Sequence, residues 1–158
     1  RRIVSSRINP FTVARDKTQA IYAFNKATTQ NSLEPKLVEL VKTRASQLNH
    51  CAHCLELHTR EAREIGESET RLYLLSAWRE SSLYTPRERA ALAWTEALTN
   101  LSQTAAPDAD YELAHSAFSD KELVELTLVI AMINIWNMFN VGFRRPEAEK
   151  HEPASITG

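Results

Sequence analysis

The side chains best suited to redox or metal chemistry lie together in Leu48–His58. This stretch, LNHCAHCLELH, holds both cysteines of the chain and three of its five histidines. On an α-helix, Cys51, Cys54 and His58 would lie at i, i+3 and i+7 and line one face. Asn49 is a good N-cap for that helix, and it would place Cys51 in the first turn, where the helix dipole favours a thiolate. The pattern is typical of a dithiol redox site with a histidine as proton donor or acceptor.

The same residues leave two other interpretations open. Zinc binds C-x-x-C pairs with a following histidine, but a closed structural site needs four ligands, and the sequence has no second C-x-x-C. His50 and His53 are the only nearby candidates, and His53 lies about 100° around the helix from Cys54, so it would face elsewhere. The third interpretation is a buried, inert thiol pair. Haem attachment is excluded because Leu55 follows the second cysteine.

Composition narrows the class of protein. The 158 residues are enough for one domain, 1–158, with a real hydrophobic core. A net charge of −1 lacks the basic excess that nucleic acid or an anionic membrane surface requires, so we expect small-molecule or protein partners, no nucleic acid and no membrane. The basic N-terminus has no apolar secretory segment, which favours a cytoplasmic location where both cysteines rest as thiols. Only three glycines leave few tight turns, which predicts an all-α fold.

Apolar periodicity and capping residues predict the elements that position these side chains. An extended arm (1–17) and a tail (146–158) would flank a core of about 18–145. Pro35 fits the first position of one helix, and Gly66 fits the left-handed end of the cysteine helix. Thr85 with Glu88 and Ser119 with Glu122 form two capping boxes. The predicted helices cover 18–28, 35–48, 51–65, 68–78, 86–101, 107–118 and 120–143.

The last predicted helix is apolar on nearly every side. It must therefore be central or lie at an oligomer interface, and we expect a homo-oligomer. Four polar residues interrupt it and disfavour a membrane span: Glu125, Asn134, Asn137 and Asn140. The three asparagines could hydrogen-bond across a subunit interface or near the cysteines, and the sequence does not choose between these places. His115 and His151 are expected at the surface, and the three tryptophans in the core or an interface.

A short internal sequence similarity suggests a repeat of a helix pair. KLVELV at 36–41 resembles ELVELT at 122–127. If the two segments continue in register, Cys51 pairs with Asn137 and Cys54 with Asn140, so the second copy would have lost both thiols. Two unrelated amphipathic helices that share a short motif would give the same pattern.

A longer pattern resembles a known family. Glu39, then CAHC at 51–54, then His58 resembles the E-x(11)-C-x-H-C-x(3)-H signature of AhpD-like alkylhydroperoxidases, in the carboxymuconolactone decarboxylase-like superfamily. The resemblance covers about 33–100 well and the C-terminal helix more loosely. It implies an all-α fold, trimers or hexamers, and a peroxidase that uses thiols without a cofactor or metal. Decarboxylase members lack the cysteine pair, which argues against lactone decarboxylation.

The resemblance also assigns roles at the site. Cys54 would attack a hydroperoxide, Cys51 would resolve the sulfenic acid to a disulfide, and Glu39, His53 and His58 would relay protons. An external dithiol such as a lipoyl carrier would then reduce the disulfide. The helix dipole instead favours Cys51 as the more acidic thiol, so the order of attack stays open. By itself Glu39 would be interpreted as a solvated residue. The alternative function is a helical oligomer that senses metal or redox state without turnover.

Overall fold

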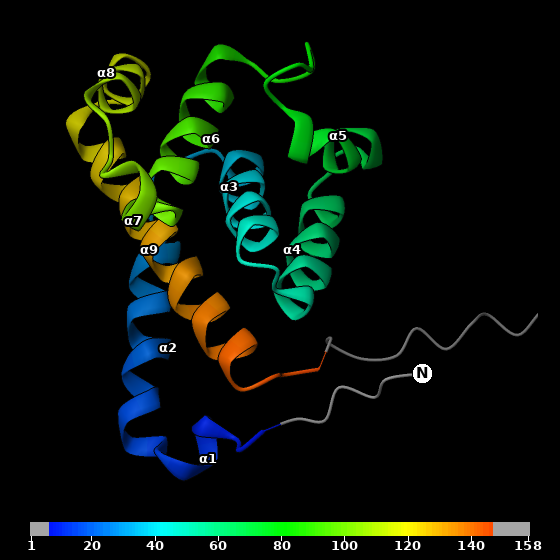
Figure 1. The fold of residues 1–158 in the computed structure, drawn as a ribbon, viewed down its shortest axis with the longest axis vertical. Helices are drawn as coiled ribbons and strands as arrows, with labels where there is room; N and C mark the ends of the chain where they lie inside the picture. Colours follow the sequence, from blue (N-terminus) through cyan, green and yellow to red (C-terminus); the bar gives the residue numbers. More distant parts are fainter. Residues whose placement is uncertain (1–6, 147–158) are drawn as a thin grey trace, which may run out of the picture.

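The computed structural model describes residues 7–146, and every regular element in that range is helical (Figure 1). This confirms the predicted all-α fold. One short 3-10 helix, η1, covers Leu75–Ala77. The α-helices are α1 (Pro10–Val13), α2 (Arg15–Thr29), α3 (Pro35–Leu48), α4 (Ala52–Glu64), α5 (Glu69–Leu74), α6 (Pro86–Thr99), α7 (Leu101–Thr104), α8 (Asp108–Ala117) and α9 (Asp120–Gly142).

The local signals at the helix ends are largely confirmed. Both predicted capping boxes form, at Thr85 and at Ser119, and each supplies hydrogen bonds to backbone N–H groups that a helix start leaves without partners. Gly66 has φ +86°, the left-handed conformation expected after α4. Pro35 begins α3.

The predicted extended arm is wrong for residues 10–17, which are mostly helical. Asn9 caps α1 by accepting a hydrogen bond from the backbone N–H of Phe11, and Pro10 occupies the first helical position. An Asn-Pro pair is typical of a helix start, so this helix could have been predicted from the sequence. The rest of the arm (1–6), and the predicted tail from 147 onward with His151, lie outside the described residues.

Helix α3 is central, and α9 crosses the bundle beside it. Helix α3 packs against α4, α6 and α9, while α9 also packs against α2, α4 and α8 (Figure 1). Because α3 and α4 form a hairpin and α9 lies against both, α9 meets a pair of helices from which it is far removed in the sequence. The α3–α4 turn carries the cysteines.

The predicted helix-pair repeat is wrong. In the first copy a turn separates α3 from α4 at residues 49–51. The matching residues of the second copy lie inside α9, which runs without a break from Asp120 to Gly142. The shared tetrapeptide therefore reflects two amphipathic helices and no duplicated hairpin.

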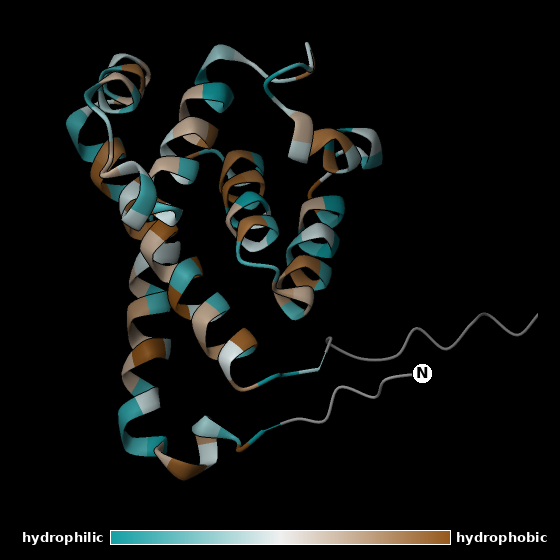
Figure 2. Cartoon of the chain, in the orientation of Figure 1, coloured by the Kyte–Doolittle hydropathy of each residue, from teal (hydrophilic) through white to brown (hydrophobic). Residues whose placement is uncertain are grey.

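Helix α9 has the length and apolar composition of a membrane-spanning helix. Figure 2 shows that hydrophilic positions interrupt its hydrophobic colour. It packs against five other helices of the bundle. A helix that is packed on several sides is apolar on most of its surface, as a membrane-spanning helix is.

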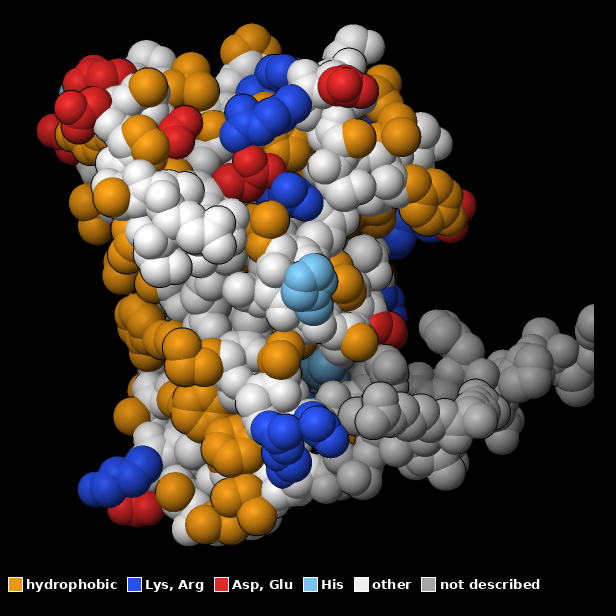
Figure 3. Space-filling model, in the orientation of Figure 1, with side chains coloured by type: hydrophobic (Ala, Val, Ile, Leu, Met, Phe, Trp, Pro, Cys, Tyr) orange, Lys and Arg blue, Asp and Glu red, His pale blue; other side chains and the backbone are white. Residues whose placement is uncertain are grey.

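Part of α9 also faces outward. Its exposed apolar side chains are Val124, Leu128, Met138 and Val141. Figure 3 shows hydrophobic side chains gathered along the side of the molecule where α9 and α2 lie. We name these four residues the outer α9 stripe.

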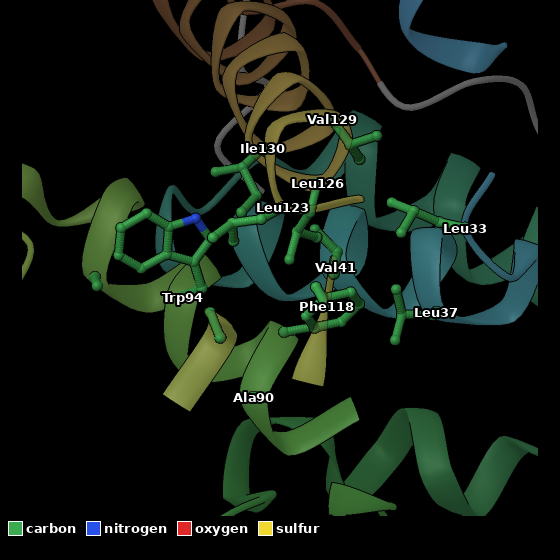
Figure 4. Close-up of a cluster of buried hydrophobic side chains, with 13 residues drawn as sticks. Leu33, Leu37, Val41, Ala90, Trp94, Phe118, Leu123, Leu126, Val129 and Ile130 are labelled. Carbon is green, nitrogen blue, oxygen red and sulfur yellow. The ribbon is translucent and has the colours of Figure 1, made fainter. Parts of the chain in front are cut away.

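The main core lies between α3, α6, α8 and α9. Leu37 and Val41 from α3 meet Leu126 and Ile130 from α9, with Trp94 at one end (Figure 4). A smaller cluster joins Ala45, Cys51, Cys54 and Ile133, with Trp136 packed against it. The cysteines are therefore built into the hydrophobic interior.

Truncation of one buried α9 side chain should measure how much this core contributes to the free energy of unfolding. Leu126 is fully buried, so Leu126→Ala should lower the free energy of unfolding by about 3 kcal/mol, because it removes apolar contacts and leaves a cavity. Urea unfolding followed by circular dichroism would measure the change. Leu113→Ala on α8, where the leucine is exposed, is the matched control and should change stability little. Equal losses in both variants would contradict this account of the core.

Candidate active site

The turn between α3 and α4 places the first cysteine at the start of α4. Asn49 is the C-cap of α3, and its backbone N–H donates to the carbonyl of Ala45. His50 follows in a left-handed conformation, with φ 54°. Cys51 is then the N-cap of α4, and its sulfur accepts a hydrogen bond from the backbone N–H of Cys54 at 3.2 Å. The prediction that Asn49 caps this helix is therefore wrong.

Asn49 has a different role because α9 lies within its reach. Its side-chain nitrogen donates to Oδ1 of Asn134 at 2.8 Å and to Oδ1 of Asn137 at 2.9 Å. Asn137 in turn donates to Oγ of Ser46 at 3.0 Å. These bonds fix the α3–α4 turn against α9. The asparagine stripe of α9 thus lies beside the cysteines, a placement that the sequence left undecided.

The two cysteines form a disulfide, with their Cα atoms 5.3 Å apart. The structure thus holds the oxidised state of the pair, whereas resting thiols were expected. Cys51 is 1% exposed and Cys54 is 2% exposed. A pair at the first turn of a helix can change between dithiol and disulfide without a large movement of the backbone.

Glu39 turns inward from α3 and pairs with His58 of α4. Its Oε2 lies 3.0 Å from Nδ1 of His58, and its Oε1 accepts from Nζ of Lys42 at 2.9 Å. Oε2 of Glu61 lies 3.2 Å from the same histidine nitrogen. The family signature placed Glu39 correctly, while its interpretation as a solvated residue is wrong. Lys42 and Glu61 were missed, although each lies three residues from its partner on the same helix, a spacing typical of helical pairs.

These contacts shift both pKa values in the direction that favours an ion pair. Burial alone would raise the pKa of Glu39, but the hydrogen bond from His58 and the charge of Lys42 outweigh it and hold the pKa below its ordinary 4.5. Burial alone would lower the pKa of His58, but hydrogen bonds to Glu39 and Glu61 raise it above its ordinary 6.5. The imidazole is thereby made a stronger base.

His53 lies at the same site, although its position on the helix predicted that it would face elsewhere. Its Nδ1 is 2.7 Å from the backbone carbonyl oxygen of Pro146, in the segment that follows α9. That contact brings the segment over the first turn of α4, and His53 is 7% exposed.

A cavity of about 690 Å³ opens between α2, α3, α4 and α9. Cys54, His53, His58 and Glu39 all line it, whereas Cys51 does not. Lys42 and Arg145 supply positive charge. Much of the remaining wall is apolar and is formed by Leu33, Val38, Leu57, Val129, Met132, Ile133 and Trp136.

One group in the described part of the chain could hold a metal ion. Ligand atoms of Glu39, His58 and Glu61 all lie within 4.8 Å of one another. The ammonium group of Lys42 against Glu39 and the raised pKa of His58 both oppose a cation there. The group contains neither sulfur, so the zinc interpretation based on the cysteines finds no support in its geometry.

The fold and the site together define a class: a helical protein whose buried CxxC pair meets a buried carboxylate–imidazole pair at one cavity. Sequence comparison identifies the family. The chain belongs to the carboxymuconolactone decarboxylase family, whose family model matches residues 16–97. The resemblance to AhpD-like proteins of this superfamily is confirmed.

The chain is also similar to individual proteins and solved structures. The uncharacterized protein YdfG of Bacillus subtilis is 35% identical over 147 residues, which cover 93% of this chain and 100% of YdfG. A solved structure from Agrobacterium tumefaciens, provisionally named an antioxidant defence protein AhpD, is 39% identical with a TM-score of 0.89, and the match covers 92% and 100% of the two chains. An uncharacterized peroxidase-related protein from Ralstonia eutropha, described as an alkylhydroperoxidase AhpD core, is 18% identical with a TM-score of 0.76. The match covers 88% and 74% of the two chains and shows the fold alone.

The Glu39–His58 pair should give stability a defined pH window. A histidine with a raised pKa stabilises the fold fully below 6.5 and loses this effect as the pH rises through its folded-state pKa. A carboxyl group with a lowered pKa stabilises fully above 4.5 and loses this effect as the pH falls through its folded-state pKa. The stability difference between the wild type and Glu39→Gln should therefore be largest between these values, at roughly 2 kcal/mol.

Urea unfolding across pH would measure this difference. Glu64→Gln is the matched control, because Glu64 is an exposed residue of α4. It should give no such window. A difference between wild type and Glu39→Gln that does not change with pH would contradict the ion pair.

Proposed function

We propose that this chain is a thiol-dependent hydroperoxide reductase, that is, a disulfide oxidoreductase of antioxidant defence that cycles Cys51 and Cys54. The observation that carries the proposal is the cavity, which holds the Cys54 sulfur together with His58 and Glu39. A nucleophilic sulfur, a base and a group that orients the base are the components of an activated thiol. The AhpD-like fold and the complete signature support the same chemistry.

Access favours Cys54 as the sulfur that attacks first. Cys54 lines the cavity, while Cys51 lies behind it and does not. Cys51 is nevertheless disulfide-bonded to Cys54, so it can reach the sulfenic acid. The helix dipole, which favours an acidic Cys51, would then serve the resolving step.

The proposed cycle balances as follows. The thiolate of Cys54 attacks the outer oxygen of a hydroperoxide, an S–O bond forms, the O–O bond breaks, and the alcohol leaves after taking a proton. Sulfur is oxidised by two electrons and the peroxide is reduced by two. The sulfenic acid condenses with the Cys51 thiol and releases water as the disulfide forms. An external dithiol, of lipoyl type, exchanges with this disulfide, restores both thiols and leaves as its own disulfide.

His58 is the proposed proton carrier, with Glu39 as the group that orients it. The hydrogen bond from Nδ1 to Glu39 leaves Nε2 as the imidazole nitrogen available to the cavity. His53 is proposed as a second relay group because it lines the same wall. The apolar remainder of the cavity suits an organic hydroperoxide better than hydrogen peroxide, since apolar walls gain free energy only by covering an apolar body.

Thiol counting would test the proposal directly. Reduced wild-type protein should lose two thiols for each cumene hydroperoxide consumed, and dihydrolipoamide should sustain turnover. Cys54→Ser should abolish both reactions. Cys51→Ser should consume one equivalent of peroxide, accumulate a sulfenic acid that dimedone traps, and then stop.

Undiminished turnover by Cys54→Ser would overturn the proposal. Thiols that remain unreactive toward peroxide, together with zinc that stays bound after dialysis, would favour the alternative of a sensor without turnover. Cys51→Ser should fold normally, because serine is a good N-cap.

We also propose that the chain works as a homo-oligomer, a trimer or hexamer. The outer α9 stripe supports this, because exposed apolar side chains on one long helix are typical of a subunit interface.

Sedimentation would test the assembly. Met138→Glu, at a side chain that is 71% exposed, should shift the wild-type oligomer to smaller species, because a buried unpaired charge is costly. Tyr73→Glu on α5, at 72% exposure, is the matched control and should leave the mass unchanged. A monomeric wild type would contradict the proposal.

A further inference from the structure

We infer that Asn140 is a further catalytic residue, whose side-chain amide holds the Cys54 sulfur as a thiolate and receives the O–H group of the incoming hydroperoxide. The inference rests on the proposed thiol chemistry and extends it to a residue outside the CxxC signature. Nδ2 of Asn140 lies 3.3 Å from Sγ of Cys54. Asn140 is 6% exposed and lines the same cavity.

The donor comes from α9, a different part of the chain from the hairpin that carries the cysteines. Among the described residues, no other side chain donates a hydrogen bond to this sulfur. Asn137, one turn earlier, binds Ser46 and accepts from Asn49, so this part of α9 is held in place against the α3–α4 turn. The amide of Asn140 is therefore positioned by contacts that do not involve the reacting atoms.

The two sulfurs receive hydrogen bonds of different origin. The backbone N–H of Cys54 donates to Sγ of Cys51, so the start of α4 serves the first cysteine. Asn140 serves the second. A hydrogen bond to the charged form of an acid lowers its pKa, and the effect is large where water is excluded. Asn140 would thus stabilise the thiolate of Cys54, which lines the cavity, as the helix start stabilises that of Cys51.

The other half of the amide has no partner in the described structure. Oδ1 of Asn140 is a buried oxygen without a hydrogen bond among residues 7–146. Such atoms are uncommon, because a buried acceptor that is not satisfied costs free energy. A hydroperoxide carries one O–H donor, and so does the sulfenic acid that it leaves on Cys54. One planar amide can therefore donate to the sulfur and accept from the oxygen that this sulfur attacks.

Titratable side chains from every adjoining element also line the cavity that Cys54 lines. They are Tyr22 of α2, Glu39 and Lys42 of α3, His53, His58, Glu61 and Glu64 of α4, and Arg145 after α9. A substitution at position 140 leaves all of them in place. A change in the acidity of Cys54 after such a substitution can therefore be assigned to the amide.

The test measures the acidity of Cys54 without any peroxide. In a reduced Cys51→Ser background only Cys54 can react, so the rate of alkylation by iodoacetamide against pH reports its pKa. Asn140→Ala should raise that pKa by about one unit, which lowers the rate at neutral pH roughly tenfold. Asn140→Asp keeps the shape of the side chain but replaces the donor by a carboxylate, so it should raise the pKa further. The ultraviolet absorbance of the thiolate would check both values independently.

Asn31→Ala is the matched control, because Asn31 lines the same cavity but hydrogen-bonds to Thr28 and Leu33 and does not contact the sulfur. It should leave the alkylation profile unchanged. An unchanged profile in both folded Asn140 variants, or an equal shift in Asn31→Ala, would overturn the inference. Because alkylation needs no peroxide, an Asn140-dependent profile in a protein that fails to reduce hydroperoxides would refute the proposed function and leave the thiolate contact standing.

Discussion

The structure depends on the contact between one long helix and one tight turn. The buried amide of Asn137 in α9 binds Asn49 and Ser46 at the α3–α4 turn, and this contact fixes where α4 begins. A buried polar group is costly unless it finds a partner, so such a network tolerates few alternative registers. The position of the first turn of α4, and with it both cysteines, follows from this constraint. The same stripe that interrupts the apolar surface of α9 is thus the reason that the site has a defined geometry.

The second constraint is electrostatic. Glu39 and His58 are both more than nine-tenths buried, and an isolated charge in such a place would be strongly unfavourable. Lys42 and Glu61 complete the group, so each charged atom has an opposite neighbour. This arrangement keeps a basic imidazole next to an apolar cavity. It also explains why the hairpin must pack closely, because Glu39 and His58 come from its two different helices.

Together these constraints give a site in which the two thiols are not equivalent. Both cysteines belong to one hydrophobic cluster, but Cys54 lines the cavity and Cys51 does not. This difference suits the proposed cycle, because the attacking thiol must meet the substrate in the cavity. The resolving thiol needs to reach only the sulfenic acid. The sequence pattern C-x-x-C does not contain the distinction, since both residues lie on one face of one helix. The cavity that Cys54 lines and Cys51 does not is formed in part by α2 and α9, which lie far from the cysteines in the sequence.

The sequence by itself determined the helical class and most helix boundaries, and it brought Cys51, Cys54 and His58 to one site. The resemblance of its longer motif to a known family added Glu39 and His53. These features depend on local capping, on apolar periodicity and on a motif whose spacing one hairpin satisfies. Only the tertiary structure decided that Cys51 caps the helix in place of Asn49, that Glu39 turns inward, and that Asn140 contacts a sulfur. The first and the last depend on the packing of α9, which takes the Asn49 side chain away from the helix start and brings Asn140 to Cys54. The orientation of Glu39 depends on the hairpin, because its partner His58 comes from the other helix.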